Sequence, residues 1–300
     1  MSDVPSGIVV VDKPPGWTSH DVVARVRRLA GTRRVGHAGT LDPMATGVLV
    51  LGVGRATRLL GHLAATDKEY AATIRLGEST ITDDAEGETA GSADASGLDD
   101  ADIRAAAGRF VGHIEQVPSA VSAVKVDGRR AYQRVRAGED VVLKPRSVHV
   151  AGIEISGVRR EGTTVDVDVS VTCSSGTYIR ALARDIGSTL GVGGHLTRLR
   201  RTRVGVFSLA EARSLEESER GLVVVPLDEV ARRAFATYGV NAEQAVWVTH
   251  GRPLRDTDFG PEGPVAIVDP EGRFLALYEQ RGRDARALAV FAADTSGTGV

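Results

Sequence analysis

Gly36-His37-Ala38-Gly39-Thr40-Leu41-Asp42-Pro43-Met44-Ala45-Thr46-Gly47 is the stretch on which the interpretation of the whole sequence depends. It lies between a basic helical segment and the apolar run 48–51, which is typical of a buried strand. Three glycines and one proline in this stretch predict a loop with a defined backbone path. Asp42 is its only carboxylate, and Pro43 restricts the backbone before it, so that side chain has few directions to take. The alternative is a surface turn with Asp first and Pro second.

Composition indicates a globular protein without a membrane span. The chain has 300 residues, of which 42% are hydrophobic and 25% are charged. This length predicts one large domain and one small one. No apolar run reaches the length of a membrane-spanning helix, and residues 1–5 lack the features of a signal peptide. Cys173 is the only cysteine, which excludes a disulfide within the chain, and we expect a cytoplasmic protein.

Charge is unevenly distributed although the formal net charge is only −2. Residues 81–103 contain eight acids and neither Lys nor Arg. Residues 125–146 contain seven bases against three acids, and residues 180–203 contain six arginines against Asp185. Separate basic segments on a nearly neutral chain favour a localised phosphate-binding surface. A solvated charged face is the alternative.

Hydrophobic periodicity predicts alternating strands and helices. In the first part we expect a helix over 19–30 with Ser19 as its N-cap, a strand over 68–77 and a helix near 99–110. Further on we expect a strand at 122–126, a short helix at 130–136, strands at 148–156 and 164–173 joined through 157–162, a helix at 177–190 and a strand at 195–204. Short strands at 245–249, 265–268, 274–278 and 287–291 predict a small β-rich C-terminal domain.

Gly52-Val53-Gly54 follows a predicted strand and introduces a rival hypothesis. The two glycines resemble the start of a dinucleotide-binding fingerprint, which would make the protein a nicotinamide-dependent oxidoreductase. Thr57 stands where the third glycine belongs. A tight strand-to-helix turn explains both glycines equally well.

Several motifs resemble one known family. The segment 36–43 is similar to the signature of the bacterial tRNA pseudouridine-55 synthases, the TruB family. Segments 11–19, 68–70 with 76–77, 82–87, 174–185 and 195–201 also resemble that family's motifs, in the same order. The resemblance implies an α+β pseudouridine synthase fold with a central mixed, mostly antiparallel sheet flanked by helices and loops, plus a small β-rich PUA-like C-terminal domain. We expect a catalytic domain at 1–232, with a basic RNA-gripping insertion at about 120–148, and the PUA-like domain at 233–300.

The resemblance also implies the chemistry and its catalytic residues. Converting uridine to pseudouridine breaks the N1–C1′ bond, rotates the base and joins C5 to C1′, so we expect neither a cofactor nor a metal. Asp42 would be the nucleophile or base. Arg180 would keep it ionised, because a guanidinium stays charged and offers two parallel donors. Tyr70 would stack on a base flipped out of its helix, although a strand tyrosine also packs commonly in a core.

Substrate contacts are assigned more broadly. His37 would stack near the flipped nucleotide, Lys13 would contact a phosphate or orient the Asp42 loop, and Leu199 would form an apolar wall. A histidine bonded within its own loop, a solvated lysine and a core leucine are the respective alternatives. Phosphate contacts are predicted for basic residues of the two basic segments, namely Lys125, Arg129, Arg130, Arg198 and Arg200.

The expected partner is tRNA, bound through its T-arm stem-loop, and the expected target is uridine 55. We expect a monomer that needs no protein partner and no membrane. Residues 120–123 lack an aromatic that many family members carry, which puts that one contact in doubt. The alternative function is a non-catalytic tRNA-folding or RNA-binding factor with the same surface.

Overall fold

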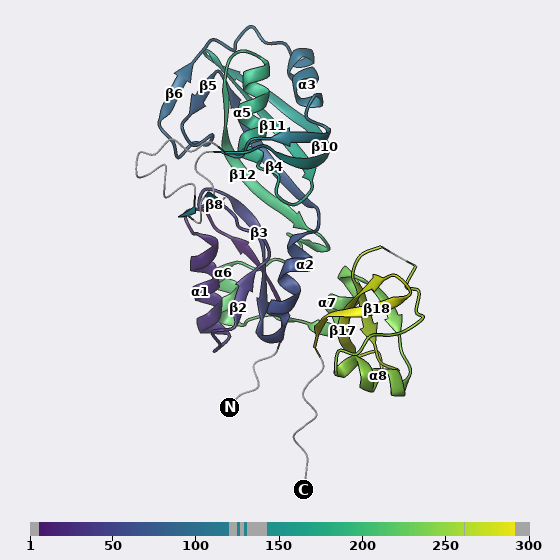
Figure 1. The fold of residues 1–300 in the computed structure, drawn as a ribbon. Helices are drawn as coiled ribbons and strands as arrows, with labels where there is room; N and C mark the ends of the chain where they lie inside the picture. Colours follow the sequence, from purple (N-terminus) through teal and green to yellow (C-terminus); the bar gives the residue numbers. More distant parts are fainter. Residues whose placement is uncertain (1–5, 120–124, 127–128, 131–142, 261, 292–300) are drawn as a thin grey trace.

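One large mixed sheet forms the centre of the molecule. The computed structural model describes residues 6–119, 125–126, 129–130, 143–260 and 262–291 (Figure 1). The main path of the sheet is β14-β1-β3-β12-β4-β11-β10-β7, with β2 paired to β3 and β13 paired to β12. Only the β12–β3 pairing is parallel among the pairings of this sheet that the described residues form. The predicted α+β class with a mixed, mostly antiparallel sheet is therefore confirmed.

The sheet strands are β1 (Gly7–Lys13), β2 (Val35–His37), β3 (Thr46–Val53), β4 (Lys68–Leu76), β7 (Gly112–Gln116), β10 (Arg146–Glu161), β11 (Thr164–Cys173), β12 (Gly194–Val204), β13 (Phe207–Ser208) and β14 (Val225–Pro226). Two small hairpins are β5 (Glu78–Thr80) with β6 (Thr89–Ser92), and β8 (Lys125–Val126) with β9 (Arg129–Arg130). The helices are α1 (Ser19–Leu29), the 3₁₀ helix η1 (Gly54–Leu59), α2 (Leu60–Ala64), α3 (Asp100–Gly108), α5 (Ile179–Thr189), α6 (Leu215–Arg220) and α7 (Leu227–Ala234). None of the described helices is long and apolar enough to cross a membrane.

Strands β1 and β3 are buried on both faces, which explains their continuous apolar sequences. Val9 and Leu49 face one core, which also contains apolar side chains of α1, α5, β4 and β11. Val10 and Val50 face a second core, on the other side of the sheet, with η1 and α7. Figure 1 shows α1 and α6 at one end of the sheet and α3 and α5 at the other. The centre of the sheet is thus a rigid support for whatever its edges and loops carry.

A second sheet lies beside α7 and carries the C-terminal part of the chain (Figure 1). It has the order β15 (Ala236–Gly239), β16 (Val265–Val268), β17 (Phe274–Arg281) and β18 (Asp284–Val290), with helix α8 (Ala242–Thr249) packed against it. Phe274 and Phe291 stack within the second core of the large sheet. Arg55 and Arg58 donate to the carbonyls of Phe291 and Val290, at 2.7 and 2.6 Å. The second sheet is therefore joined to the first by apolar packing and by hydrogen bonds.

Three predicted elements need correction. The segment 245–249 is helical and not a strand, because Asn241 and Gln244 form a capping box that starts α8. Helix α1 has Thr18 as its N-cap in place of Ser19, and Asp21 completes that capping box. Strand β10 continues to Glu161 past an irregularity near Gly157, where a connection was expected. The strand predicted at 122–126 and the helix at 130–136 lie mostly outside the described residues; the described parts are β8 and β9.

The strand-to-helix turn at Gly52 and Gly54 offers no phosphate cradle. A Cβ on Gly52 would lie 2.9 Å from the Ala56 carbonyl oxygen, so close packing accounts for that glycine. The Gly54 N–H donates to Arg34 O at 2.8 Å, and the Arg55 N–H donates to Ser6 Oγ at 3.0 Å. Backbone donors that would bind a pyrophosphate are already used. The geometry therefore gives the dinucleotide hypothesis no support.

Candidate active site

The Asp42 loop, residues 38–47, is fixed mainly through its backbone. Ser19 at the start of α1 exchanges two hydrogen bonds with Leu41: its Oγ donates to Leu41 O at 3.1 Å and accepts from Leu41 N at 2.8 Å. The Gly16 N–H donates to Pro43 O at 2.9 Å. Asp42 O accepts from Ala45 N at 3.1 Å, so a turn with Asp first and Pro second is present. This turn is held at a defined place against α1 and is not a free surface turn.

Two buried cations complete the support of the Asp42 loop. Lys13 is fully buried and its Nζ donates to the carbonyls of Pro14, Trp17 and Pro43 at 2.9, 2.7 and 3.1 Å. Arg201 on β12 is 1% exposed and donates to Gly39 O at 3.1 Å and Thr40 O at 3.3 Å. The sequence left two roles for Lys13, orientation of the Asp42 loop and contact with a phosphate. Its burial and its three carbonyl contacts favour the first.

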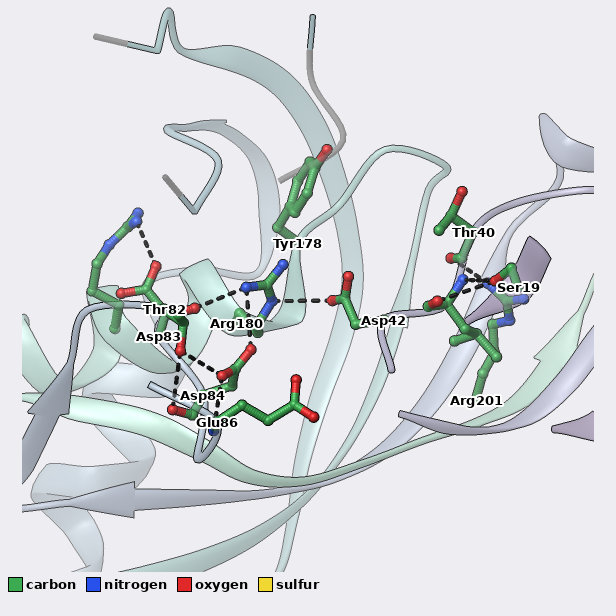
Figure 2. Close-up of polar contacts among 12 residues, drawn as sticks. Ser19, Thr40, Asp42, Thr82, Asp83, Asp84, Glu86, Tyr178, Arg180 and Arg201 are labelled. Atoms are coloured by element: carbon green, nitrogen blue, oxygen red, sulfur yellow. Dashed lines mark hydrogen bonds and ion pairs between the residues drawn. The ribbon is translucent and has the colours of Figure 1, made fainter. Parts of the chain in front are cut away.

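Arg180 lies between two carboxylates that come from different loops (Figure 2). Its Nε is 3.0 Å from Asp42 Oδ2, and its Nη1 is 3.2 Å from Asp84 Oδ2. Nη1 also donates to Thr82 O at 2.8 Å. The Arg180 side chain is 4% exposed, and that of Asp42 is 37% exposed. The guanidinium thus joins the Asp42 loop to loop 80–86 through ion pairs with one carboxylate from each.

A pocket of about 250 Å³ opens in front of Asp42. Its lining includes Asp42, Arg180, Tyr70 and Leu199, four of the residues assigned to the site from sequence. They come from a loop, α5, β4 and β12, which the sheet brings together although they are up to 157 residues apart (199 − 42). The pocket therefore combines apolar surface from Tyr70 and Leu199 with the buried Arg180 and one partly exposed carboxylate, and it is a candidate binding site for a flat ring.

Tyr70 stays protonated near neutral pH. Burial raises the pKa of its hydroxyl, and the nearby Arg201 guanidinium, including a hydrogen bond from it, opposes that rise. Its side chain is 7% exposed yet lines the pocket. Tyr70 can thus offer the pocket a ring face and a neutral hydroxyl.

His37 lies at the end of β2, beside the ring of His20 at 5.7 Å between centroids. Burial lowers the pKa of its imidazole, so the neutral ring is favoured. His37 does not line the pocket around Asp42. Its contact with a nucleotide therefore stays a prediction.

The predicted phosphate-binding residues have different surroundings. Arg198 is exposed on β12. Arg200 is half-buried and binds Asp12 through two hydrogen bonds of 3.0 and 2.6 Å. The side chains of Lys125, Arg129 and Arg130 lie outside what the structure describes. Of the two arginines whose side chains are described, Arg198 has the geometry that fits a phosphate contact better.

Three site residues were missed from the sequence: Lys68, Asp84 and Arg201. Lys68 and Arg201 line the pocket, and Asp84 reaches it through Arg180. The alternation of β12 could have found Arg201, because it lies two residues after Leu199 and so on the same face. Asp84 lies in the motif-like segment 82–87, but no periodicity singles it out there, since its place depends on how the loop before β6 folds back.

Comparisons with known proteins show the family to which the chain is similar. The family model described as TruB family pseudouridylate synthase (N terminal domain) matches residues 27–179. Models described as tRNA pseudouridylate synthase B C-terminal domain and tRNA Pseudouridine synthase II, C terminal, match 180–228 and 235–292. The tRNA pseudouridine synthase B of Thermobifida fusca is 58% identical over 95% of this chain and 98% of its own. The protein of the same name from Streptomyces griseus is 56% identical over 97% and 99%.

Solved structures give the same result for the fold. A chain from an H/ACA RNP bound to a substrate RNA containing 2′-deoxyuridine superimposes with a TM-score of 0.70 and 26% identity, covering 96% of this chain and 85% of that one. A chain from a Cbf5-Nop10-Gar1 complex gives 0.68 and 27%, covering 97% and 84%. With a matching N-terminal family model and relatives more than half identical over nearly their whole length, the chain belongs to the TruB family of pseudouridylate synthases.

Proposed function

We propose that this protein isomerises a uridine of tRNA to pseudouridine, and that the target is uridine 55 in the T-arm loop. The observation that carries the proposal is the half-exposed Asp42 carboxylate in the wall of a pocket, paired with an arginine that is almost fully buried. The names of the relatives, tRNA pseudouridine synthase B, support tRNA as the substrate. The choice of the T-arm rests on the motif resemblance.

The reaction balances without any added reagent. The N1–C1′ bond breaks, the base rotates, C5 joins C1′, and the proton lost from C5 is matched by the proton gained at N1. Asp42 acts as nucleophile or base, and Arg180 orients its carboxylate through the ion pair of 3.0 Å. Tyr70 and Leu199 hold the base that has left its stack, because an unstacked base binds well to aromatic and apolar side chains.

RNA binding is assigned to the surface around this pocket. Arg198 on β12 and the basic segment that includes Lys125, Arg129 and Arg130 would contact phosphates of the stem. The C-terminal domain expected at 233–300, whose described part contains the second sheet, resembles a PUA module and would bind another part of the same tRNA. We propose that the protein works as a monomer in the cytoplasm and needs no protein partner.

The test is to incubate the purified protein with a T-arm stem-loop and to map pseudouridine by chemical modification and primer extension. We expect conversion of one uridine, at position 55, and no conversion when that uridine is replaced by cytidine. Asp42→Asn should give no product. Asp166→Asn is the matched control, because Asp166 lies on β11 in an ion pair with Arg75 and lines no part of the pocket.

Two outcomes would contradict the proposal. Conversion of other uridines, with position 55 untouched, would overturn the assigned target. Tight stem-loop binding without product, together with full biological effect of Asp42→Asn in cells, would favour the non-catalytic RNA-folding factor. The name of the relatives and the geometry around Asp42 do not favour that alternative.

A further inference from the structure

Besides Asp42, the Arg180 guanidinium has two further partners, and both belong to one loop. Loop 80–86, between β5 and β6, offers the Arg180 Nη1 both Thr82 O at 2.8 Å and Asp84 Oδ2 at 3.2 Å. Asp83 lies between these two residues in the chain. Any change in the backbone at Asp83 would therefore move both acceptors at once.

Asp83 has a backbone conformation that needs support. Its φ is +60°, a left-handed value that costs a non-glycine residue energy. Its N–H donates to Thr80 O at 3.3 Å, and its carbonyl accepts from Leu196 N on β12 at 3.1 Å. Its side chain is only 12% exposed and points towards α5 (Figure 2). A buried carboxylate at a strained position persists only if its surroundings hold it there.

Arg184 forms an ion pair with this carboxylate, which the Ser119 hydroxyl also approaches. Arg184 lies four residues after Arg180 on α5, and therefore one turn along the same helix face. Its Nη1 donates to Asp83 Oδ2 at 3.0 Å, its Nε to Asp185 Oδ1 at 2.9 Å and its Nη2 to Val117 O at 2.8 Å. The three nitrogens of one guanidinium thus join α5, loop 80–86 and the end of β7.

We propose that Arg184 and Asp83 are a positioning pair, which fixes loop 80–86 on α5 so that Arg180 stays directed at Asp42. The inference rests on the proposed function, because it concerns the turnover of that same site. Neither residue lines the pocket that would hold the target base. They act through Arg180: when the loop relaxes, Thr82 O and Asp84 move, and the guanidinium that follows them leaves the Asp42 carboxylate.

Arg184→Met and Asp83→Asn test this inference in steady-state assays on the T-arm stem-loop. Each should lower kcat by about five- to tenfold and leave KM within about twofold, because a partly exposed ion pair with these contacts contributes on the order of 1 kcal/mol. An unchanged KM is expected because the pair lies outside the pocket and acts on the geometry of Arg180. The double variant should be no slower than the slower single one, because both changes remove the same interaction.

Further variants separate positioning from general stability. Asp83→Gly tolerates the positive φ, so a loss of kcat in this variant comes from the missing carboxylate and not from backbone strain. Arg184→Lys keeps the charge but loses the fork of donors, and it should fall between wild type and Arg184→Met. Arg75→Met is the matched control, since Arg75 forms a comparable ion pair with Asp166 at 2.8 Å, with side chains 31% and 21% exposed, away from the pocket.

The outcomes are distinguishable from a failure of the proposed function. If the wild type makes no pseudouridine, the function itself is wrong. If the wild type is active, a normal kcat in folded Arg184→Met and Asp83→Asn overturns the positioning role. A rise in KM with unchanged kcat, or an equal loss in Arg75→Met, overturns it as well.

Discussion

Two loops bring an aspartate each to the same arginine, yet the two carboxylates have different surroundings. Arg180 is 3.0 Å from Asp42 and 3.2 Å from Asp84. The side chain of Asp42 is 37% exposed in a pocket, whereas that of Asp84 is 4% exposed. Proximity to a buried guanidinium therefore does not by itself identify the reacting acid. Its access to the pocket is what favours Asp42 as the reacting acid that we propose.

The loops also differ in what holds them. Asp84 uses its carboxylate for its own loop, accepting from Thr82 Oγ1 at 2.5 Å and from Glu86 N at 3.1 Å. The Asp42 loop is held through carbonyl oxygens, which accept from Lys13 and Arg201. A loop fixed by its backbone leaves its side chain available for chemistry. In a loop fixed by its side chain, as at Asp84, the carboxylate is already occupied by hydrogen bonds.

The largest effect should separate the two aspartates. Asp42→Asn should lower single-turnover formation of pseudouridine at least about 10³-fold, because an amide is neither a nucleophile nor a base. Asp84→Asn keeps the side-chain size and one acceptor but weakens the hold on Arg180, so about 10- to 100-fold is expected. Urea unfolding of both variants checks that each is folded. Equal losses in two folded variants would show that the difference in exposure does not decide which acid reacts.

The sequence alone was sufficient for the long strands β4, β10, β11 and β12 and for four of the residues that line the pocket. Asp42 and Arg180 stand in motifs, and the alternating pattern of β4 placed Tyr70 on a strand facing a core. The structure brings these residues together because β4, β12 and β3 are neighbours in the sheet. That order depends on pairing between distant segments, which local patterns do not encode.

Other features could not be predicted for physical reasons. A buried cation such as Lys13 has the same sequence signature as a solvated turn lysine, because its fate depends on carbonyls that only the folded loop provides. The segment 245–249 looked like a strand because Val246, Val248 and Thr249 are β-branched. The capping box at Asn241 outweighed that preference.

A middle-sized effect tests how rigid the Asp42 loop must be. Gly47 ends this loop with φ +101°, and a Cβ there would lie 2.2 Å from the Arg201 carbonyl oxygen. Because the backbone of β12 cannot give way cheaply, Gly47→Ala should lower the free energy of unfolding by about 3 kcal/mol and reduce turnover. Gly16→Ala is the matched control: Gly16 has φ +78° with nothing within 4 Å of an added Cβ, so about 1 kcal/mol is expected. Similar losses in urea titrations of both variants would contradict the close contact.

The smallest expected effect depends on pH and concerns the cation that holds the Asp42 loop. Burial lowers the pKa of Lys13 from 10.5 to about 8. Between these two values the unfolded chain retains a proton that the folded chain has released, so the free energy of unfolding contributed by Lys13 rises with pH across this window, by about 1–3 kcal/mol. Loop 80–86 is held by the arginine side chains of Arg180 and Arg184 instead.

The measurement is the free energy of unfolding of the wild type minus that of Lys13→Met, at pH 7 and at pH 10. We expect this difference to increase with pH, while turnover of the wild type falls above about pH 8, because a neutral amine has two N–H groups for three carbonyl acceptors. Lys68→Met is the control, since burial lowers the pKa of Lys68 to about 8 as well. When both proteins also carry Lys68→Met, the difference in the free energy of unfolding between the chain with Lys13 and its Lys13→Met variant should still increase with pH. If this difference in the free energy of unfolding does not change, or decreases with pH, Lys13 does not lose its proton in this window. The hold on the Asp42 loop would then be as independent of pH as the hold on loop 80–86.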